Sequence, residues 1–276
     1  MDVAHPLDHY LRVDRLPHMW CPGCGIGIAV SSLLRAINRH IEEGRFRQED
    51  VATISGIGCT ARATLYLNFD SAHVIHGRAI PFATGLKLVK PNLKVIVIGG
   101  DGDIAAIGGN HLLHAARRNM DLTVIMVNNM IYGMTGGQVA PTTPTGVYTT
   151  TTPLGNFEYS INVVKFVSTL NVNYLARASV THPHLLEKYI YTALSKEGFS
   201  FVEVVSPCPE IFGRHIGYKD PVELFNKLRS LIRYEEKPSI EKSDIVWGKE
   251  IFVGEFINDN KRSFLNTLVE VMRYKV

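Results

Sequence analysis

The chain has 276 residues, of which 46% are hydrophobic and 20% charged, and its formal net charge is +3 at pH 7. This length and composition suit a globular protein with a substantial buried core, organised as one large domain or as one domain with an appendage. The small charge and the lack of long lysine or arginine runs exclude nucleic acid as an expected partner, and no stretch approaches the ~18 apolar residues of a membrane-spanning helix.

The amino-terminal region carries the first chemical signal. Residues 1–20 lack the apolar core of a signal peptide, so a cytoplasmic location is expected. Cys21 and Cys24 then form a C-x-x-C pair on a loop with Pro and Gly, directly before an apolar-periodic helix expected through residues 28–37. Two sulfurs at a helix start suit a zinc site, a redox dithiol or half of an iron–sulfur site, and two unligated thiols are the alternative.

A third cysteine follows the first expected strand. Residues 51–54 are a short apolar run, and they lead into a Gly-rich loop that holds Cys59, with Arg62 just beyond it. The pattern places a thiol at the end of a strand.

A second short strand is expected at residues 73–75, and it leads into His76 and Arg78. A helix is expected to follow near residues 81–87. A lone histidine or arginine on such a loop is usually a surface or capping residue, but the two together could hold a phosphate ahead of the helix amino terminus.

Residues 94–129 predict a βαβ unit around which the rest of the chain is organised. Residues 94–98 and 122–127 are β-branched, apolar runs typical of buried parallel strands, and an apolar stripe at residues 112–116 predicts a helix between them. A right-handed crossover would place the two strands side by side, or nearly so. Their carboxyl ends would then share the edge where open α/β sheets bind ligands.

Polar side chains follow both strands of this unit. Asp101 comes directly after the first strand and Asn129 after the second. Two protein oxygens together with phosphate oxygens usually hold Mg²⁺, and Gly100 and Gly102 would let the backbone approach a phosphate because they lack a Cβ. A plain strand-to-helix turn is one alternative. A nicotinamide-type Rossmann turn is another, but it needs a third glycine where Ala105 stands and an acidic residue where two asparagines stand.

The spacing of these residues resembles the thiamine diphosphate motif, which is GDG, an intervening stretch and then NN. Here twenty-five residues separate Gly102 from Asn128. The resemblance implies that Asp101, Asn129 and the backbone carbonyl of Ile131 bind Mg²⁺.

The chain then runs as a long loop, a strand and a helix. The loop, residues 140–153, is rich in threonine and proline, and loops of this length inside compact domains are more often functional than not. A mobile surface excursion is the alternative. Residues 173–178 predict a strand, and Thr181 with Pro183 predicts the cap of an amphipathic helix.

A fourth cysteine lies where the last clear strand ends. Residues 201–205 run directly into Cys208, just as an earlier strand runs into Cys59, so both cysteines should lie at the edge that carries the thiamine diphosphate motif. Cys21 and Cys24 complete a set of four. Four thiolates could hold zinc or a [4Fe–4S] cluster, and beside a thiamine site an electron acceptor makes more chemical sense.

The character of the sequence changes at residue 213. One helix is expected around residues 222–232, and a charged stretch leads to a short terminal helix around residues 263–273. This part has too little core to fold alone. The expected division is therefore a thiamine diphosphate- and Mg-binding domain with the cluster loops at residues 1–212, and an arm at residues 213–276 that packs on this domain or on a partner.

Over roughly residues 20–213 the sequence is similar to the β subunits of the 2-oxoacid:ferredoxin oxidoreductases. The similarity is carried by motifs in the family's order: WCPGCG, GIGC, HGRAIPFATGLK, GDGD, NN, YGMTGGQ and SPCPEIFG. The segment YGMTGGQVAPTTPTG is most similar to the 2-oxoglutarate (KorB-type) branch. The resemblance implies an α/β thiamine diphosphate-binding fold with a mostly parallel sheet flanked by helices.

The resemblance also implies the residues of the site. The [4Fe–4S] cluster would be bound by four cysteines: Cys21, Cys24, Cys59 and Cys208. Thiamine diphosphate would be bound by residues of the strand ends and Gly-rich loops: Gly58, Cys59, His76, Gly77, Gly100, Asp101, Gly102, Asp103, Asn129, Ile131, Gly133, Met134 and Thr135. The expected catalytic residues are His76 and Arg62, the latter at a position that is basic and near the substrate in relatives. Gly136 and Gly137 replace a segment where some broad-specificity relatives carry a lysine that contacts the 2-oxoacid, which leaves the partner of the substrate carboxylate open.

The activity implied is the oxidative decarboxylation of 2-oxoglutarate to succinyl-CoA and CO₂, or the reverse, with electrons passed through the cluster to ferredoxin. The 2-oxoacid and coenzyme A would be the small-molecule ligands. Family members place the glutamate that activates the aminopyrimidine of thiamine on the α subunit. This chain is therefore expected to act only with an α subunit, in a heterodimer or a higher oligomer that can include further small subunits.

Three other functions compete with this one. One is a pyruvate or broad-specificity oxidoreductase of the same group, which the pocket residues do not exclude. A non-oxidative thiamine decarboxylase would have no use for four cluster cysteines. A zinc-stabilised structural subunit would have no reason to keep both metal-ligand positions and the glycines beside them.

Overall fold

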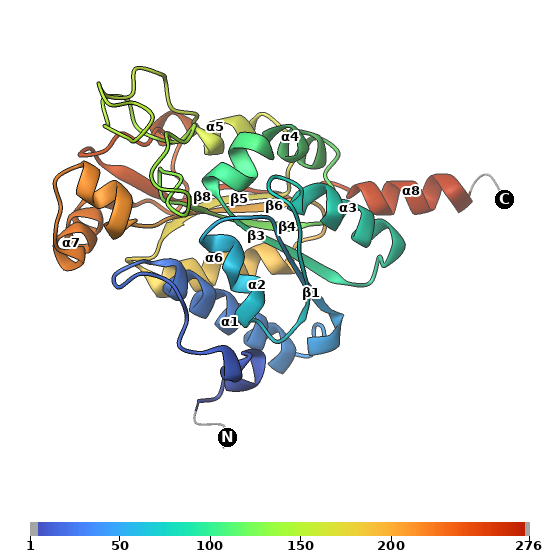
Figure 1. The fold of residues 1–276 in the computed structure, drawn as a ribbon. Coiled ribbons are helices and arrows are strands. Elements are labelled where there is room, and N and C mark those ends of the chain that lie inside the picture. Colours follow the sequence, from blue (N-terminus) through green and yellow to red (C-terminus); the bar gives the residue numbers. More distant parts are fainter. Residues whose placement is uncertain (1–4, 274–276) are drawn as a thin grey trace.

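The computed structural model describes residues 5–273, and within them eight strands form one sheet in the order β2-β1-β3-β4-β6-β5-β8-β7 (Figure 1). The strands are β1 (Val51–Ser55), β2 (Asp70–His73), β3 (Lys94–Gly100), β4 (Thr123–Asn128), β5 (Tyr174–Ser179), β6 (Ser200–Val205), β7 (Ile232–Tyr234) and β8 (Ile251–Asn258). The six strands from β2 to β5 in this order are parallel to one another, β8 is antiparallel to β5, and β7 is parallel to β8. The predicted α/β fold with a mostly parallel sheet is confirmed.

Helices cover both faces of this sheet. They are α1 (Ile26–Glu42), α2 (Ala63–Tyr66), α3 (Ala79–Val89), α4 (Gly109–Arg117), α5 (Val163–Ser168), α6 (Pro183–Ser195), α7 (Pro221–Leu231) and α8 (Phe264–Arg273). α1 and α6 pack against one face, whereas α3, α4 and α5 pack against the other (Figure 1). The central strands β1, β4, β5 and β6 are buried along their whole length, which explains why their sequences are mostly apolar and do not alternate between apolar and polar residues.

Short helical turns connect several of these elements. Turns of 3₁₀ type span Asp8–Tyr10, Val13–Arg15, Gln48–Asp50, Thr60–Arg62 and Ile240–Lys242, and π-helical turns span Gly102–Ile107 and Pro209–Gly213. The two π-helical turns follow the ends of β3 and β6, where the sequence places GDGD and the fourth cysteine. Such wide turns are often found at functional sites.

The predicted βαβ unit is present. β3 and β4 are hydrogen-bonded neighbours, with Ile98 opposite Ile125, so their carboxyl ends lie at the same edge of the sheet. The helical part of the unit begins earlier than predicted, because a π-helical turn precedes α4.

Two local predictions need correction. The second strand spans Asp70–His73 and not residues 73–75. β2 is an edge strand that pairs only with β1, and β1 ends at Ser55, opposite His73, so the pairing ends there apart from one hydrogen bond from the Val74 N–H to the Ser55 carbonyl. Thr181 does not cap α6, because His182 occupies the cap position without a side-chain hydrogen bond; Pro183 begins the helix as predicted.

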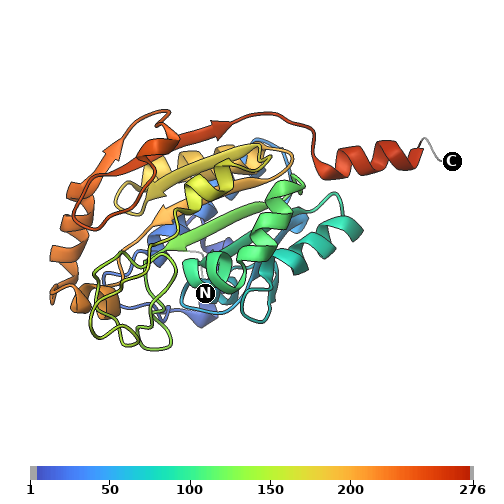
Figure 2. The ribbon, with the colours of Figure 1, turned by 90° about the horizontal axis from the view of Figure 1, so that it is seen from above.

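The last part of the chain extends the sheet and then leaves it. β8 pairs with β5, and β7 adds one more strand outside β8. In both views α8 projects away from the rest of the chain (Figures 1 and 2). Across residues 5–273, every helix is too short or too polar to cross a lipid bilayer.

Candidate cofactor site

Four neighbouring strands deliver the predicted site residues to one edge of the sheet. β1, β3, β4 and β6 are consecutive in the sheet and parallel, so their carboxyl ends lie together. Cys59, Asp101, Asn129 and Cys208 each follow one of these strands within a few residues. The arrangement is the ligand-binding edge of an open α/β sheet.

A cavity of about 230 Å³ opens at this edge. Its lining includes nearly all residues predicted to bind the cofactor: Gly58, Cys59, His76, Gly100, Asp101, Gly102, Asp103, Asn129, Ile131, Gly133, Met134 and Thr135, with Ile57, Thr60 and Tyr132 in addition. An ideal Cβ at Gly58 would meet no atom within 4 Å, and one at Gly100 would meet none closer than 3.7 Å. Both glycines therefore leave room beside the cavity that a bound group can fill.

Asp101 is a buried carboxylate at the floor of this cavity, only 2% exposed. Burial raises its pKa to about 6, although the Thr142 hydroxyl and the Gly102 N–H both donate to it and act in the opposite direction. A carboxylate in this setting is stabilised by a nearby cation. The environment of Asp101 therefore fits a metal ligand.

The turn after β4 presents the other two predicted oxygens. Asn129 is 8% exposed, and its Oδ1 accepts a hydrogen bond from the Ile131 N–H at 3.4 Å. Between them Met130 has φ of 64°, a left-handed conformation that is uncommon for a residue other than glycine. With Asp101, this turn offers a carboxylate, a carboxamide and a backbone carbonyl, which is a donor set of oxygens suited to Mg²⁺.

Asp103 ties three segments of the site together. Its carboxylate accepts the N–H groups of Gly56, Ile57 and Gly77 at 3.2, 3.3 and 2.7 Å, and its Oδ1 lies 3.1 Å from Nδ1 of His76. The loops after β1 and β2 are thus held to the turn after β3. Gly77 does not line the cavity, but its N–H is bound to Asp103, which does.

The imidazole of His76 has a defined orientation. Its Nδ1 faces two acceptors, Oδ1 of Asp103 at 3.1 Å and the carbonyl of Ile57 at 3.2 Å. Nδ1 must therefore carry a proton, which leaves Nε2 as the nitrogen able to accept one.

The four cysteines are free thiols grouped beside this cavity. The charges of Cys21, Cys59 and Cys208 all act on Cys24, and those of Cys21 and Cys208 act on Cys59. Burial raises the pKa of Cys24 to about 12; the hydrogen bond from the Ile26 N–H lowers this pKa, and the neighbouring sulfurs raise it by a smaller effect. Thiolates at these positions would need a cationic group to offset their charge.

The backbone around the cysteines favours ligation. The Ile26 N–H donates to the sulfur of Cys24, and the Ile211 and Phe212 N–H groups donate to that of Cys208. Gly23 has φ of 77°, and a Cβ there would fall 2.4 Å from Cβ of Pro221, so the C-P-G-C loop requires glycine at this position. Hydrogen bonds to sulfur are one of the means by which proteins tune iron–sulfur clusters.

The four cysteines fit an iron–sulfur cluster by residue type. Four thiolates are a usual donor set of a [4Fe–4S] cluster, and four thiolates can also hold one zinc ion. Among residues 5–273 no three cysteine, histidine or carboxylate side chains gather closely enough to hold one ion.

The long loop after β4 supplies site residues that the sequence did not single out. The Thr142 hydroxyl donates to Asp101, and that of Thr143 donates to the Met130 carbonyl at 2.7 Å. The loop is thus folded onto Asp101 and onto the turn after β4. Tyr132, which packs on Gly102, was not predicted either.

Arg62 lies apart from the cavity lining. It ends the short 3₁₀ turn that follows Cys59 and is half-buried. Its charge lowers the pKa of Cys59, although burial raises that pKa more strongly. The structure therefore places Arg62 near the cysteines rather than on the cavity wall.

Comparisons with known proteins agree with this geometry. Residues 56–204 match the C-terminal TPP-binding domain of thiamine pyrophosphate enzymes. The chain is 45% identical to the 2-oxoglutarate synthase subunit KorB of Methanocaldococcus jannaschii, over 96% of each chain. It is 46% identical to the subunit of the same name from Methanothermobacter thermautotrophicus, over 92% of this chain and 87% of the other. Among solved structures, 2-oxoglutarate:ferredoxin oxidoreductase from Magnetococcus marinus, with 2-oxoglutarate, coenzyme A and succinyl-CoA bound, superposes with a TM-score of 0.86 at 29% identity, over 99% of this chain and 91% of that one.

Proposed function

This chain belongs to the KorB family, the β subunits of the 2-oxoglutarate:ferredoxin oxidoreductases, and we propose that its sheet edge binds thiamine diphosphate, Mg²⁺ and a [4Fe–4S] cluster side by side. The observation that carries the proposal is the position of Cys59, which lines the cavity of Asp101 and Asn129 and is also one of the four grouped cysteines. Thiamine chemistry and electron transfer can then be coupled over a short path.

Mg²⁺ would be held by the carboxylate of Asp101, the side-chain oxygen of Asn129 and the backbone carbonyl of Ile131. Gly100 and Gly102 would let the diphosphate approach the backbone. Thiamine diphosphate, once bound, supplies the carbanion and the electron sink that decarboxylation of a 2-oxoacid requires. The cluster would be bound by Cys21, Cys24, Cys59 and Cys208.

Two side chains of this chain, those of His76 and Arg62, would transfer protons and attract the negatively charged substrate beside the bound cofactors. Asp103 keeps Nδ1 of His76 protonated and aimed inward, so Nε2 is available to accept or return a proton at the substrate. Arg62 is proposed to attract the anionic substrate from beside the cysteines. Asp101 is only 2% exposed, so its carboxylate is shielded from bulk water.

The reaction proposed is the conversion of 2-oxoglutarate and coenzyme A to succinyl-CoA and CO₂, or its reverse, with electrons leaving one at a time through the cluster to ferredoxin. The ligands bound in the Magnetococcus marinus enzyme support this substrate choice. An α subunit is proposed as the partner, in a heterodimer or a larger assembly. The division into residues 1–212 and an arm at residues 213–276 and the cytoplasmic location remain part of the proposal.

The proposal is tested with the complex of this chain and its partner subunit, purified without oxygen. Reduction of ferredoxin would be followed with 2-oxoglutarate, pyruvate or 2-oxobutyrate, with and without coenzyme A. We expect the highest kcat/KM with 2-oxoglutarate and a strict need for coenzyme A. Reduction with pyruvate alone would keep the family and overturn the substrate, and no reduction with any 2-oxoacid would overturn the function.

A further inference from the structure

An ion pair is buried at the centre of the sheet. Arg177 on β5 and Glu203 on β6 are opposite each other in the strand register, with Nε of the arginine 2.6 Å from Oε2 of the glutamate. Each side chain is only 1% exposed. Because burying two charges is costly and apolar replacements are often neutral for stability, such a pair is weak evidence for a stabilising role. Its other contacts indicate what it does.

One end of this pair leads to the metal-binding turn. The second carboxylate oxygen of Glu203, Oε1, accepts a hydrogen bond from Nδ2 of Asn128 at 2.8 Å. This fixes the carboxamide of Asn128 so that its Oδ1 faces the Met130 N–H and accepts it at 3.1 Å. Met130 is the residue with the left-handed backbone, between Asn129 and Ile131. An uncommon conformation of this kind persists only where the surroundings hold it.

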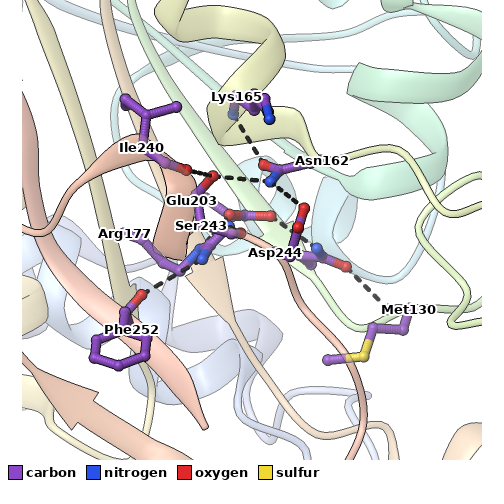
Figure 3. A network of polar contacts seen from close by, with 10 residues as sticks. Met130, Asn162, Lys165, Arg177, Glu203, Ile240, Ser243, Asp244 and Phe252 are labelled. Carbon is purple, nitrogen blue, oxygen red and sulfur yellow. Dashed lines mark hydrogen bonds and ion pairs between the residues drawn. The ribbon is translucent and has the colours of Figure 1, made fainter. Parts of the chain in front are cut away.

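The other end leads to the last part of the chain (Figure 3). Nη2 of Arg177 donates to the Ser243 carbonyl at 2.7 Å, and Nη1 donates to that of Phe252 at 3.4 Å. Asn162 holds the same segment, since its Nδ2 donates to Oγ of Ser243 at 2.8 Å and to Oδ1 of Asp244 at 2.7 Å. The guanidinium therefore has fixed partners on both sides.

A second cavity of about 230 Å³ lies against this network, lined by Asn128, Thr142, Arg177 and Glu203 among others. The buried polar side chains named here each already hydrogen-bond to another group of the chain, and none of them has an unpartnered buried atom. These bonds connect segments of the chain to one another.

We propose that Glu203, held in place by Arg177, is a positioning residue of the metal site, which acts through Asn128 on the turn that presents Asn129 and Ile131. This rests on the proposed function, because the turn matters only if it binds Mg²⁺ with thiamine diphosphate. Residues that orient metal ligands in this way typically change metal affinity ten- to a hundredfold when removed.

Two double variants separate positioning from stability. R177M/E203Q and R177M/E203L both remove the buried charges, but only the glutamine retains an acceptor for Nδ2 of Asn128. The readout is the Mg²⁺ concentration that half-saturates thiamine diphosphate binding, measured by calorimetry on the complex with its partner subunit, alongside the thermal unfolding midpoint.

We expect R177M/E203Q to bind within about threefold of the wild-type Mg²⁺ requirement, and R177M/E203L to need ten- to a hundredfold more. Their unfolding midpoints should be similar. Equal Mg²⁺ requirements in the two variants would overturn the positioning role. If either double variant fails to assemble, Asn128→Ser, which keeps the ion pair, should raise the Mg²⁺ requirement at least tenfold, and an unchanged requirement would refute the idea. A wild-type complex that binds no thiamine diphosphate would overturn the proposed function as well.

Discussion

Replacement of Asp103 tests how the loops of the site are held. Its carboxylate accepts the N–H groups of Gly56, Ile57 and Gly77 and contacts His76, and all of these contacts are lost in Asp103→Ala. Hydrogen bonds to a charged acceptor contribute roughly 1.5–3 kcal/mol each. Three of them give about 4.5–9 kcal/mol as an upper range, and water entering from the cavity would lower it. We expect the free energy of unfolding to fall by at least ~3 kcal/mol.

Asp103→Asn is the finer variant. One carboxylate oxygen remains as an acceptor for Ile57 and Gly77, while an amide nitrogen would face the Gly56 N–H, so the loss should be only ~1–3 kcal/mol. Hydrogen–deuterium exchange measures directly how well each of the three backbone N–H groups is protected. Exchange should accelerate at Gly56 alone in the Asn variant and at all three in the Ala variant.

A matched control is Asp70→Asn, at an exposed position on the edge strand β2. It should change neither exchange at the site nor stability by more than about 0.5 kcal/mol. Unaltered exchange and stability in Asp103→Ala would refute the reasoning, because the carboxylate would then not be what holds these loops together.

Three further outcomes are expected. Gly102→Ala should weaken thiamine diphosphate binding, because the new Cβ would fall 2.2 Å from the Tyr132 ring, whereas Gly109→Ala, with no atom within 4 Å, should bind normally; equal binding in both variants would contradict this. Burial lowers the pKa of His40 in the folded chain. Below pH about 6.5 this histidine is therefore protonated in the unfolded chain but not in the folded one, and the free energy of unfolding should fall by up to ~1.4 kcal/mol for each unit by which the pH is lowered. Urea midpoints between pH 5.5 and 7.5 measure this slope, which His40→Gln should flatten; a wild-type slope in that variant would show that another group titrates. Cys208→Ser should lose the iron and the visible absorbance, and an unchanged iron content would remove Cys208 from the ligand set.

The sequence predicted best those strands that are buried and parallel and that end at a residue which does not favour a strand. β3 and β4 are β-branched runs that stop at glycine and asparagine, and both strands lie where they were expected. The edge strand β2 was misplaced because its residues are polar and mostly exposed, so no hydrophobic period marks its true bounds. Register against β1, a tertiary feature, determines where it ends.

The site residues were recognisable where the chemistry depends on residue type at a strand end. Cys59, Asp101, Asn129 and Cys208 belong to this class. Thr142 could not be identified because its contact with Asp101 depends on how a long loop folds back across the sheet edge.

The amino-acid sequence also contains an indication of the buried ion pair. Arg177 and Glu203 are single charged residues near the centres of two otherwise apolar strands, YLARAS and FVEVV. Opposite charges at such positions in neighbouring strands indicate a pair inside the sheet, since an unpaired charge would be too costly to bury. What the sequence does not contain is the register that brings the two residues opposite each other.

The proposed function is tested most directly by an iron analysis and a low-temperature EPR spectrum. Both would be made on the complex of this chain with its partner subunit, purified without oxygen, before and after addition of 2-oxoglutarate. We expect about four iron atoms per chain, together with an EPR signal that appears on addition of 2-oxoglutarate and needs bound thiamine diphosphate. A protein that contains zinc in place of iron, or a cluster that no 2-oxoacid reduces, would contradict the claim that the four cysteines and the thiamine site act together.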